Sequence, residues 1–190
     1  MAAIGCDRSC IWILSFSNDL AYPAYFQFHV DRLQPAARIY ADHGIRLGLE
    51  FLGPQTIWRE KPYEFIHSSA KMMELARAIG PNVGLLLDAW HWYTAGEGPA
   101  DLAKLTNQDV VYVHVNDAPA GIALEDQVDN VRCLPGETGV IPMDVFFDGL
   151  RAMGYDGPIV AEPFKKALGD LPDDAARLAV VRESLRKIGV

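Results

Sequence analysis

Four short apolar runs in this chain each carry an ionisable residue at or near the end, and this pattern limits the folds that the chain can adopt. The runs occupy residues 45–52, 85–93, 110–115 and 158–162, and they deliver Glu50, Asp88, His114 and Glu162. An apolar strand has no packing reason to carry such groups, because burying an unpaired carboxylate is costly. Four strands of this kind therefore predict one shared ligand.

Helical segments separate these runs, so that strand and helix alternate along the chain. A further strand is expected at residues 10–16, followed by a polar and aromatic loop at 17–27. The spacing of apolar residues predicts helices at about 30–43, 63–79, 99–105, 142–153 and 172–188. Strands joined by helices pair in parallel through right-handed crossovers.

Two architectures have this alternation, and the placement of the polar residues separates them. An open doubly wound sheet usually gathers its chemistry at a topological switch point, commonly beside a glycine-rich phosphate loop. The sequence contains no such loop motif. In a (β/α) barrel, residues at the carboxyl ends of successive strands converge on one central site. The pattern therefore favours a TIM barrel of the α/β class.

Length and composition describe an ordinary metabolic enzyme. A chain of 190 residues, half of them hydrophobic, is expected to form a single domain over residues 1–190. The net charge of -8 argues against nucleic acid as a partner. Neither a secretory signal nor a membrane-spanning run is visible. Three cysteines in no zinc-binding spacing indicate reduced thiols, so we expect a cytoplasmic protein.

The strand-end residues resemble those of a known superfamily. Glu50, the pair Asp88 and His91, then His114 and Glu162 are similar to the sugar isomerases and epimerases with xylose-isomerase-like TIM barrels. Within that superfamily, the segments 114–117 and 129–139 resemble the inosose isomerase branch, which is related to tagatose 3-epimerase and hydroxypyruvate isomerase. The resemblance extends from about Ile45 onward.

The resemblance implies a divalent metal held by Glu50, Asp88, His114 and Glu162. Three carboxylates and an imidazole suit Mn²⁺, with Mg²⁺, Co²⁺ or Zn²⁺ as alternatives. A bound hydroxy-ketone is polarised by such an ion, and its neighbouring C–H becomes acidic. Relatives imply that Glu50 and Glu162 then remove and return a proton through a metal-stabilised enediolate. The sequence does not say which glutamate plays which role.

Further residues are candidates for substrate binding. His91 resembles the family histidine that hydrogen-bonds a substrate oxygen, and the guanidinium of Arg132 is placed to hold the developing enediolate oxygen. Trp90, with Trp92 and Trp58, is a candidate apolar wall for a ketose or inosose. Asp117 either orients a ligand or caps the loop that follows. For the tryptophans, ordinary core packing is the competing interpretation.

The chain is short for a complete barrel, which normally needs about 250 residues. About five βα units are visible, so the family pattern implies that the first three are absent. Of three explanations, we expect an N-terminally truncated gene model; a fragment that pairs with another chain and a short homologue closed differently are the alternatives. Exposed strand edges would in each case favour association, for example as a homo-oligomer.

Three other functions compete with a metal-dependent isomerase or epimerase. A dehydratase of the same superfamily would expel a hydroxyl from the enediolate instead of reprotonating it. Endonuclease IV-like cleavage of abasic DNA needs a richer set of histidines and carboxylates for three zinc ions. A non-catalytic assembly module would keep the partial barrel and its metal for stability alone.

Overall fold

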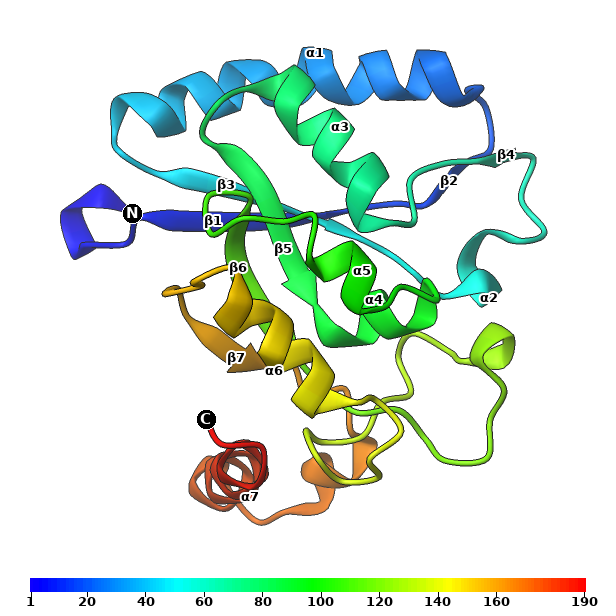
Figure 1. The fold of residues 1–190 in the computed structure, drawn as a ribbon, viewed down its shortest axis with the longest axis vertical. Coiled ribbons are helices and arrows are strands. Elements are labelled where there is room, and N and C mark those ends of the chain that lie inside the picture. The colour runs from blue at the N-terminus through cyan, green and yellow to red at the C-terminus, as the bar shows by residue number, and fades with distance from the viewer.

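A five-stranded parallel sheet forms the centre of the molecule (Figure 1). The computed structural model describes residues 1–190, the side chain of Ala2 excepted. Every neighbouring pair of strands is parallel. The strands follow one another across the sheet as β1 (Arg8–Ile13), β3 (Arg46–Phe51), β5 (Val83–Asp88), β6 (Val110–Val115) and β7 (Ile159–Ala161). The predicted α/β class and its five parallel strands are thereby confirmed.

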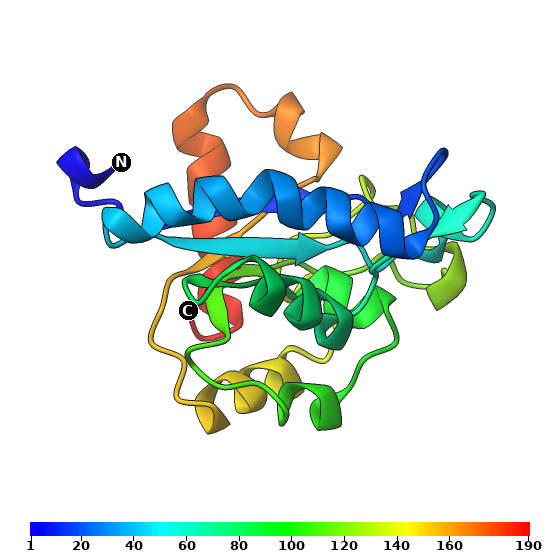
Figure 2. The same cartoon turned by 90° about the horizontal axis from the view of Figure 1, so that it is seen from above.

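Helices cover one face of this sheet. Figure 2 shows α3, α5 and α6 on that side, whereas α7 crosses the level of the sheet, and Figure 1 shows α7 beyond the β7 edge. The helices are α1 (Tyr22–Asp42), α2 (Gln55–Trp58), α3 (Ser69–Ile79), α4 (Ala89–Thr94), α5 (Pro99–Leu102), α6 (Met143–Ala152) and α7 (Asp174–Lys187). Short 3-10 turns occur at η1 (Ala2–Ile4), η2 (Leu124–Asp126) and η3 (Lys166–Asp170).

Strand alternation separates the residues that pack under the helices from those that face the open side of the sheet. Successive side chains of a strand point to opposite faces. One set is apolar and belongs to the main hydrophobic core: Leu47, Leu49, Phe51, Leu85, Leu87, Val113 and Val115. The intervening set contains Glu50, Asp88 and His114. The helix-covered face thus supplies stability, and the other face is free to carry chemistry.

Two expectations about element boundaries were wrong. The first helix begins at Tyr22 and not at Val30, because Pro23 at its second position suits a helix start and aromatic side chains continue the helical spacing. Tyr22 and Tyr25 pack on Phe65, with ring centroids 5.0 and 4.7 Å apart. Local polarity had suggested a loop there, whereas tertiary packing makes the segment helical.

The second predicted helix, expected from residue 63, begins later than expected. Residues Tyr63–Glu64 form β4, which pairs in antiparallel fashion with β2 (Phe16–Ser17). The helix starts only at Ser69, after two buried residues that the helical pattern had included. This small second sheet was missed, because two-residue strands have no periodicity to detect.

Strands β1 and β7 are the two edges of the sheet. Apolar side chains on or near both edges are exposed, including Ile11, Trp12, Val160 and Phe164. None of the described helices is both long enough and apolar enough to cross a membrane.

Candidate metal centre

Four side chains converge at the carboxyl ends of the sheet strands. Strands β3, β5 and β6 carry the first three, and the fourth follows β7 directly. One ligand atom from each of these residues lies within 4.8 Å of the others, and the residues are Glu50, Asp88, His114 and Glu162. Strands β5 and β6 pair Asp88 directly with His114, which explains why these two residues are at the same level. The structure therefore brings together the set expected from the sequence.

Two buried atoms in this cluster have no hydrogen-bond partner. They are Glu50 Oε1 and His114 Nδ1, which lie 3.7 Å apart. His114 Nδ1 is also 3.6 Å from Glu162 Oε2. Buried polar atoms are nearly always partnered in folded proteins. These two atoms, together with an oxygen-rich ligand set, fit a divalent cation placed between them.

Protonation in the cluster reflects the same crowding of negative charge. Burial raises the pKa of Glu50 to about 7, although the neighbouring His114 partly offsets this rise. Burial alone would lower the pKa of His114, but the carboxylates of Glu162 and Glu50 raise it to about 10. In the metal-free protein, a proton on the imidazole therefore supplies the positive charge that the carboxylates favour.

Asp88 is the most strongly fixed of the four. Its side chain is fully buried and caps α4, with Oδ1 accepting from the Trp90 amide at 2.7 Å. Asn116 Nδ2 also donates to Oδ1 at 3.2 Å, and Arg132 Nη1 donates to Oδ2 at 2.8 Å. Burial opposes ionisation, but the guanidinium of Arg132 holds the pKa of Asp88 below its usual value. Asp88 is therefore a charged and immobile acceptor.

Arg132 was expected to bind a substrate oxygen, but most of its N–H groups bind carboxylates of the site itself. Its Nη1 donates to both Asp88 and Glu162 at 2.8 Å. Its Nε donates to the Asp129 carbonyl at 2.8 Å, and Nη2 donates to Asp129 Oδ1 at 2.9 Å. Four of its five N–H groups are thereby used. The expected substrate role rests on the remaining Nη2 hydrogen, while the other four make Arg132 an organiser of the site.

The hydrogen bonds of His91 assign its tautomer. The amide of Gly53 donates to Nδ1 at 3.2 Å, so Nδ1 is an acceptor. Burial lowers the pKa of His91 to about 4, which leaves the ring neutral with its hydrogen on Nε2. Nε2 lies 3.3 Å from Arg132 Nη2, and because both atoms carry hydrogens in this tautomer, the contact between them is not a hydrogen bond. Two N–H donors are thus adjacent in the site, and they match an oxygen acceptor.

A cavity of about 520 Å³ opens beside these groups. Its polar lining includes Glu50, His91, Asp129, Arg132 and Glu162. Its apolar lining includes Trp12, Leu14, Leu52, Ile57, Val128 and Phe164. This volume is within the usual range for a small-molecule pocket. Two of the candidate ligands, Glu50 and Glu162, therefore face one space of suitable size together with the donors His91 and Arg132.

The tryptophan wall expected from the sequence is not formed by Trp90. This indole is fully buried and lies behind the guanidinium of Arg132, whose Cζ is 5.2 Å from the ring centroid. Trp92 is also buried, and Trp58 stacks on His67 at 4.2 Å. None of the three lines the cavity, whereas Trp12 does. Their aromatic character was visible in the sequence, but their burial was not.

Asp117 caps the loop that follows β6. Its carboxylate is completely buried and accepts four backbone N–H groups at 2.7 to 3.0 Å, from Ala118, Thr138, Gly139 and Ile141. Its own amide and carbonyl pair with Cys133. One side chain thus ties both ends of the loop that carries Arg132, and the capping alternative is the one observed.

Sequence reasoning missed two polar residues of the site. Asn116 shares its strand face with His114, so alternation would have placed it beside Asp88. Asp129 lies three residues before Arg132, a spacing that permits the ion pair observed at 2.9 Å. In each case a signal was present, but neither residue ends an apolar run.

Comparison with known proteins agrees with this geometry. Residues 1–188 match the family model of the xylose isomerase-like TIM barrel. The chain belongs to that family. The match includes all five sheet strands, so the convergence of strand-end residues is a property of a TIM-barrel fold.

Relatives with assigned activities share about a quarter of their aligned residues with this chain. The inosose isomerase of Halalkalibacterium halodurans is 25% identical over 162 residues, which is 83% of this chain and 46% of that protein. The 3-dehydroshikimate dehydratase of Pseudomonas aeruginosa is 27% identical over 189 residues, which is 97% of this chain and 28% of that protein. The chain spans less than half the length of either relative.

Solved structures show the same fold. A xylose isomerase domain protein from Alicyclobacillus acidocaldarius superposes with a TM-score of 0.82 at 36% identity, covering 98% of this chain and 65% of that one. The IOLI protein with a binding zinc atom superposes with a TM-score of 0.82 at 19% identity, covering 98% and 64%. Both structures extend beyond the region shared with this chain.

Proposed function

We propose that this chain carries the metal site of an isomerase or epimerase that acts on a keto-polyol such as an inosose or a ketose. The observation that supports this most strongly is the convergence of Glu50, Asp88, His114 and Glu162 within 4.8 Å. Family membership and the inosose isomerase relative support the reaction class. Residues of the site, and not the fold alone, carry the argument.

The metal is a divalent cation held by the four converging residues. Mn²⁺ is our first choice because three of the four ligands are carboxylates, and Mg²⁺, Co²⁺ and Zn²⁺ are alternatives. The binding zinc atom of the IOLI neighbour supports a divalent cation as the ligand. When bound, such an ion polarises a carbonyl and makes the neighbouring C–H more acidic.

The protein's own residues then orient the substrate and move the proton. His91 Nε2–H and the free Arg132 Nη2–H bind one substrate oxygen, which becomes negative as the enediolate forms. Glu50 and Glu162 are the two carboxylates within reach of the reacting carbons, and one removes the proton that the other returns. Asp88 stays ionised through its bond to Arg132 and does not exchange protons at neutral pH.

The test is exchange of a carbon-bound proton with solvent. With Mn²⁺ and an inosose or ketose in D₂O, NMR should show deuterium entering the substrate beside its carbonyl. Glu162→Gln should abolish this exchange in a folded protein, whereas the exposed control Glu74→Gln should retain it. Exchange at the original rate in Glu162→Gln would refute the role given to that residue.

A dehydratase is the second candidate, and the 3-dehydroshikimate dehydratase relative favours it. It shares the first proton removal and differs in the fate of the enediolate, which loses a neighbouring hydroxyl. A dehydrated product detected by mass spectrometry would decide for this reaction. Stoichiometric Mn²⁺ without turnover of any ketose or inosose would instead favour a non-catalytic metal-binding module.

A further inference from the structure

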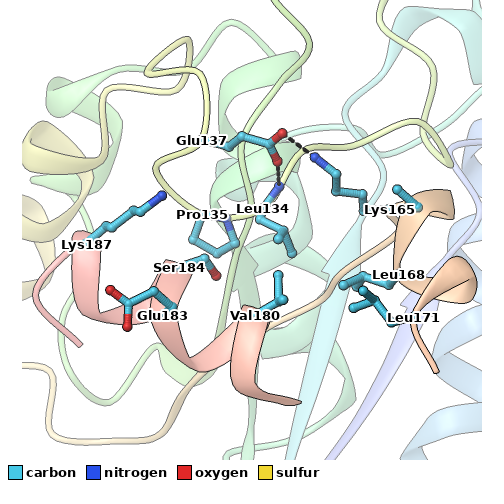
Figure 3. A pocket seen from close by; sticks show the side chains of 11 residues that line it. Leu134, Pro135, Glu137, Lys165, Leu168, Leu171, Val180, Glu183, Ser184 and Lys187 are labelled. Carbon is cyan, nitrogen blue, oxygen red and sulfur yellow. Dashed lines mark hydrogen bonds and ion pairs between the residues drawn. The ribbon is translucent and has the colours of Figure 1, made fainter. Parts of the chain in front are cut away.

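Two ion pairs join the same two loops beside the metal centre, one inside the site and one outside. The inner pair links Arg132 Nη1 with Glu162 Oε2 at 2.8 Å. The outer pair links Glu137 with Lys165, at the edge of a neighbouring cavity of about 440 Å³ (Figure 3). Each loop therefore contributes one positive and one negative group.

Two donors hold the carboxylate of the outer pair. Glu137 Oε2 accepts from the Leu134 amide at 2.9 Å, while Oε1 accepts from Lys165 Nζ. Burial alone would raise the pKa of Glu137, but Lys165 and the Leu134 amide hold it below its usual value. Figure 3 shows Leu134 and Leu168 close to the pair, and both line the cavity. An ionised, partly desolvated pair of this kind is stronger than one in open water.

Glu162 is the most exposed of the four candidate ligands. It follows β7, an edge strand of only three residues. Its side chain is 28% exposed, against 8% for Glu50 and 0% for Asp88. Its amide reaches the Val115 carbonyl only at 3.4 Å. The ion pair with Arg132 is thus a main restraint on its side chain.

The ion pair between Arg132 and Glu162 competes with metal binding. A cation in the cluster would be coordinated by the same Glu162 carboxylate that Arg132 binds, so the inner pair weakens when the metal is bound. The outer pair shares no atom with the cluster and persists. Lys165 is only three residues from Glu162, so whatever fixes Lys165 also fixes the backbone from which Glu162 projects.

We propose that Glu137 and Lys165 are positioning residues that keep Glu162 at the metal centre when its carboxylate is not bound by Arg132. The pair acts on the backbone after β7 and does not touch substrate or cation. This inference rests on the proposed metal-binding function.

Mn²⁺ affinity, measured by titration calorimetry, provides the first test. Lys165→Glu and Glu137→Lys should each weaken binding about three- to tenfold, because attraction becomes repulsion across a partly buried pair. The double swap should bind more tightly than either single variant. Arg151→Glu and Asp148→Lys alter an equally charged but fully exposed pair on α6, and both should stay within about twofold of wild type.

Hydrogen exchange on the metal-free protein provides a second readout that needs no activity. Amides in residues 162–168 should exchange several-fold faster in Lys165→Glu and more slowly again in the double swap. Unchanged exchange in that segment overturns the inference, as does unchanged Mn²⁺ affinity where the wild type binds. A wild type that binds no Mn²⁺ contradicts the proposed function. In that case, amide hydrogen exchange in residues 162–168 still tests whether the Glu137–Lys165 pair fixes the backbone at Glu162.

Discussion

The two sides of the metal centre differ in how firmly their ligands are held. Glu50 and Asp88 stand on interior strands, where helices cover the opposite face and the side chains are 8% and 0% exposed. Glu162 follows an edge strand and is 28% exposed. The comparison teaches that one ligand set combines a rigid half, set by the sheet, with a half that depends on loop contacts.

The sharpest way to break this comparison is to remove one ligand from each half. Asp88→Ala should lower the free energy of unfolding by about 3 kcal/mol, because it leaves Arg132 and the Trp90 amide short of a buried partner. Glu162→Ala should cost about 1 kcal/mol or less. Urea denaturation in the presence of a chelator measures the two losses in the free energy of unfolding. In a separate binding titration, both variants should lose Mn²⁺ binding. Equal stability losses would show that the two halves are not different.

The loop that carries Arg132 belongs to the weaker half, yet one buried carboxylate organises it. Asp117→Asn places an amide group before backbone N–H donors that need an acceptor. We expect a loss of about 2 kcal/mol in the free energy of unfolding. The exposed Asp126→Asn in the same loop should change stability by less than about 0.5 kcal/mol. A loss below that limit in Asp117→Asn would mean that the loop is organised elsewhere.

Acidity sharpens the comparison, because protons and cations compete for the same cluster. His114, with a pKa of about 10, must lose a proton to bind a metal, and Glu50, with a pKa of about 7, must also be ionised. Mn²⁺ affinity should therefore rise about tenfold per pH unit between pH 7 and 10, and more steeply below pH 7. Calorimetry in buffers of different ionisation enthalpy counts the protons released. An affinity independent of pH would contradict the protonation assigned to His114.

The smallest effect is expected at the exposed strand edge. Trp12 is 59% exposed, so Trp12→Ala should change the free energy of unfolding by about 1 kcal/mol or less. Leu87→Ala, on the helix-covered face of β5, should by contrast cost about 3 kcal/mol. Because Trp12 lines the cavity, its loss should weaken substrate binding more than it weakens folding. Thermal denaturation and a binding titration separate the two.

Local pattern was sufficient for the parts of the fold that strands determine. Short apolar runs identified the five sheet strands, and the ionisable residues at or near the ends of four of them identified the side chains that converge. This works because parallel strands bring their carboxyl ends to one edge, whatever the loops between them do. Boundaries such as the start of α1 were lost where packing of Tyr22 and Tyr25 on Phe65 overrides local polarity.

The sequence by itself determined which ionisable residues lie at the strand ends. It also determined which of them share a face of the sheet, because side-chain direction along a strand follows a fixed period of two. Only the tertiary structure decided what the loop residues do. Arg132 pairs with Asp88 and Glu162, although 44 and 30 residues separate it from them, and Trp90 lies in the core and not in the cavity. Such contacts have no period in the sequence, because they arise when distant loops fold over a common edge.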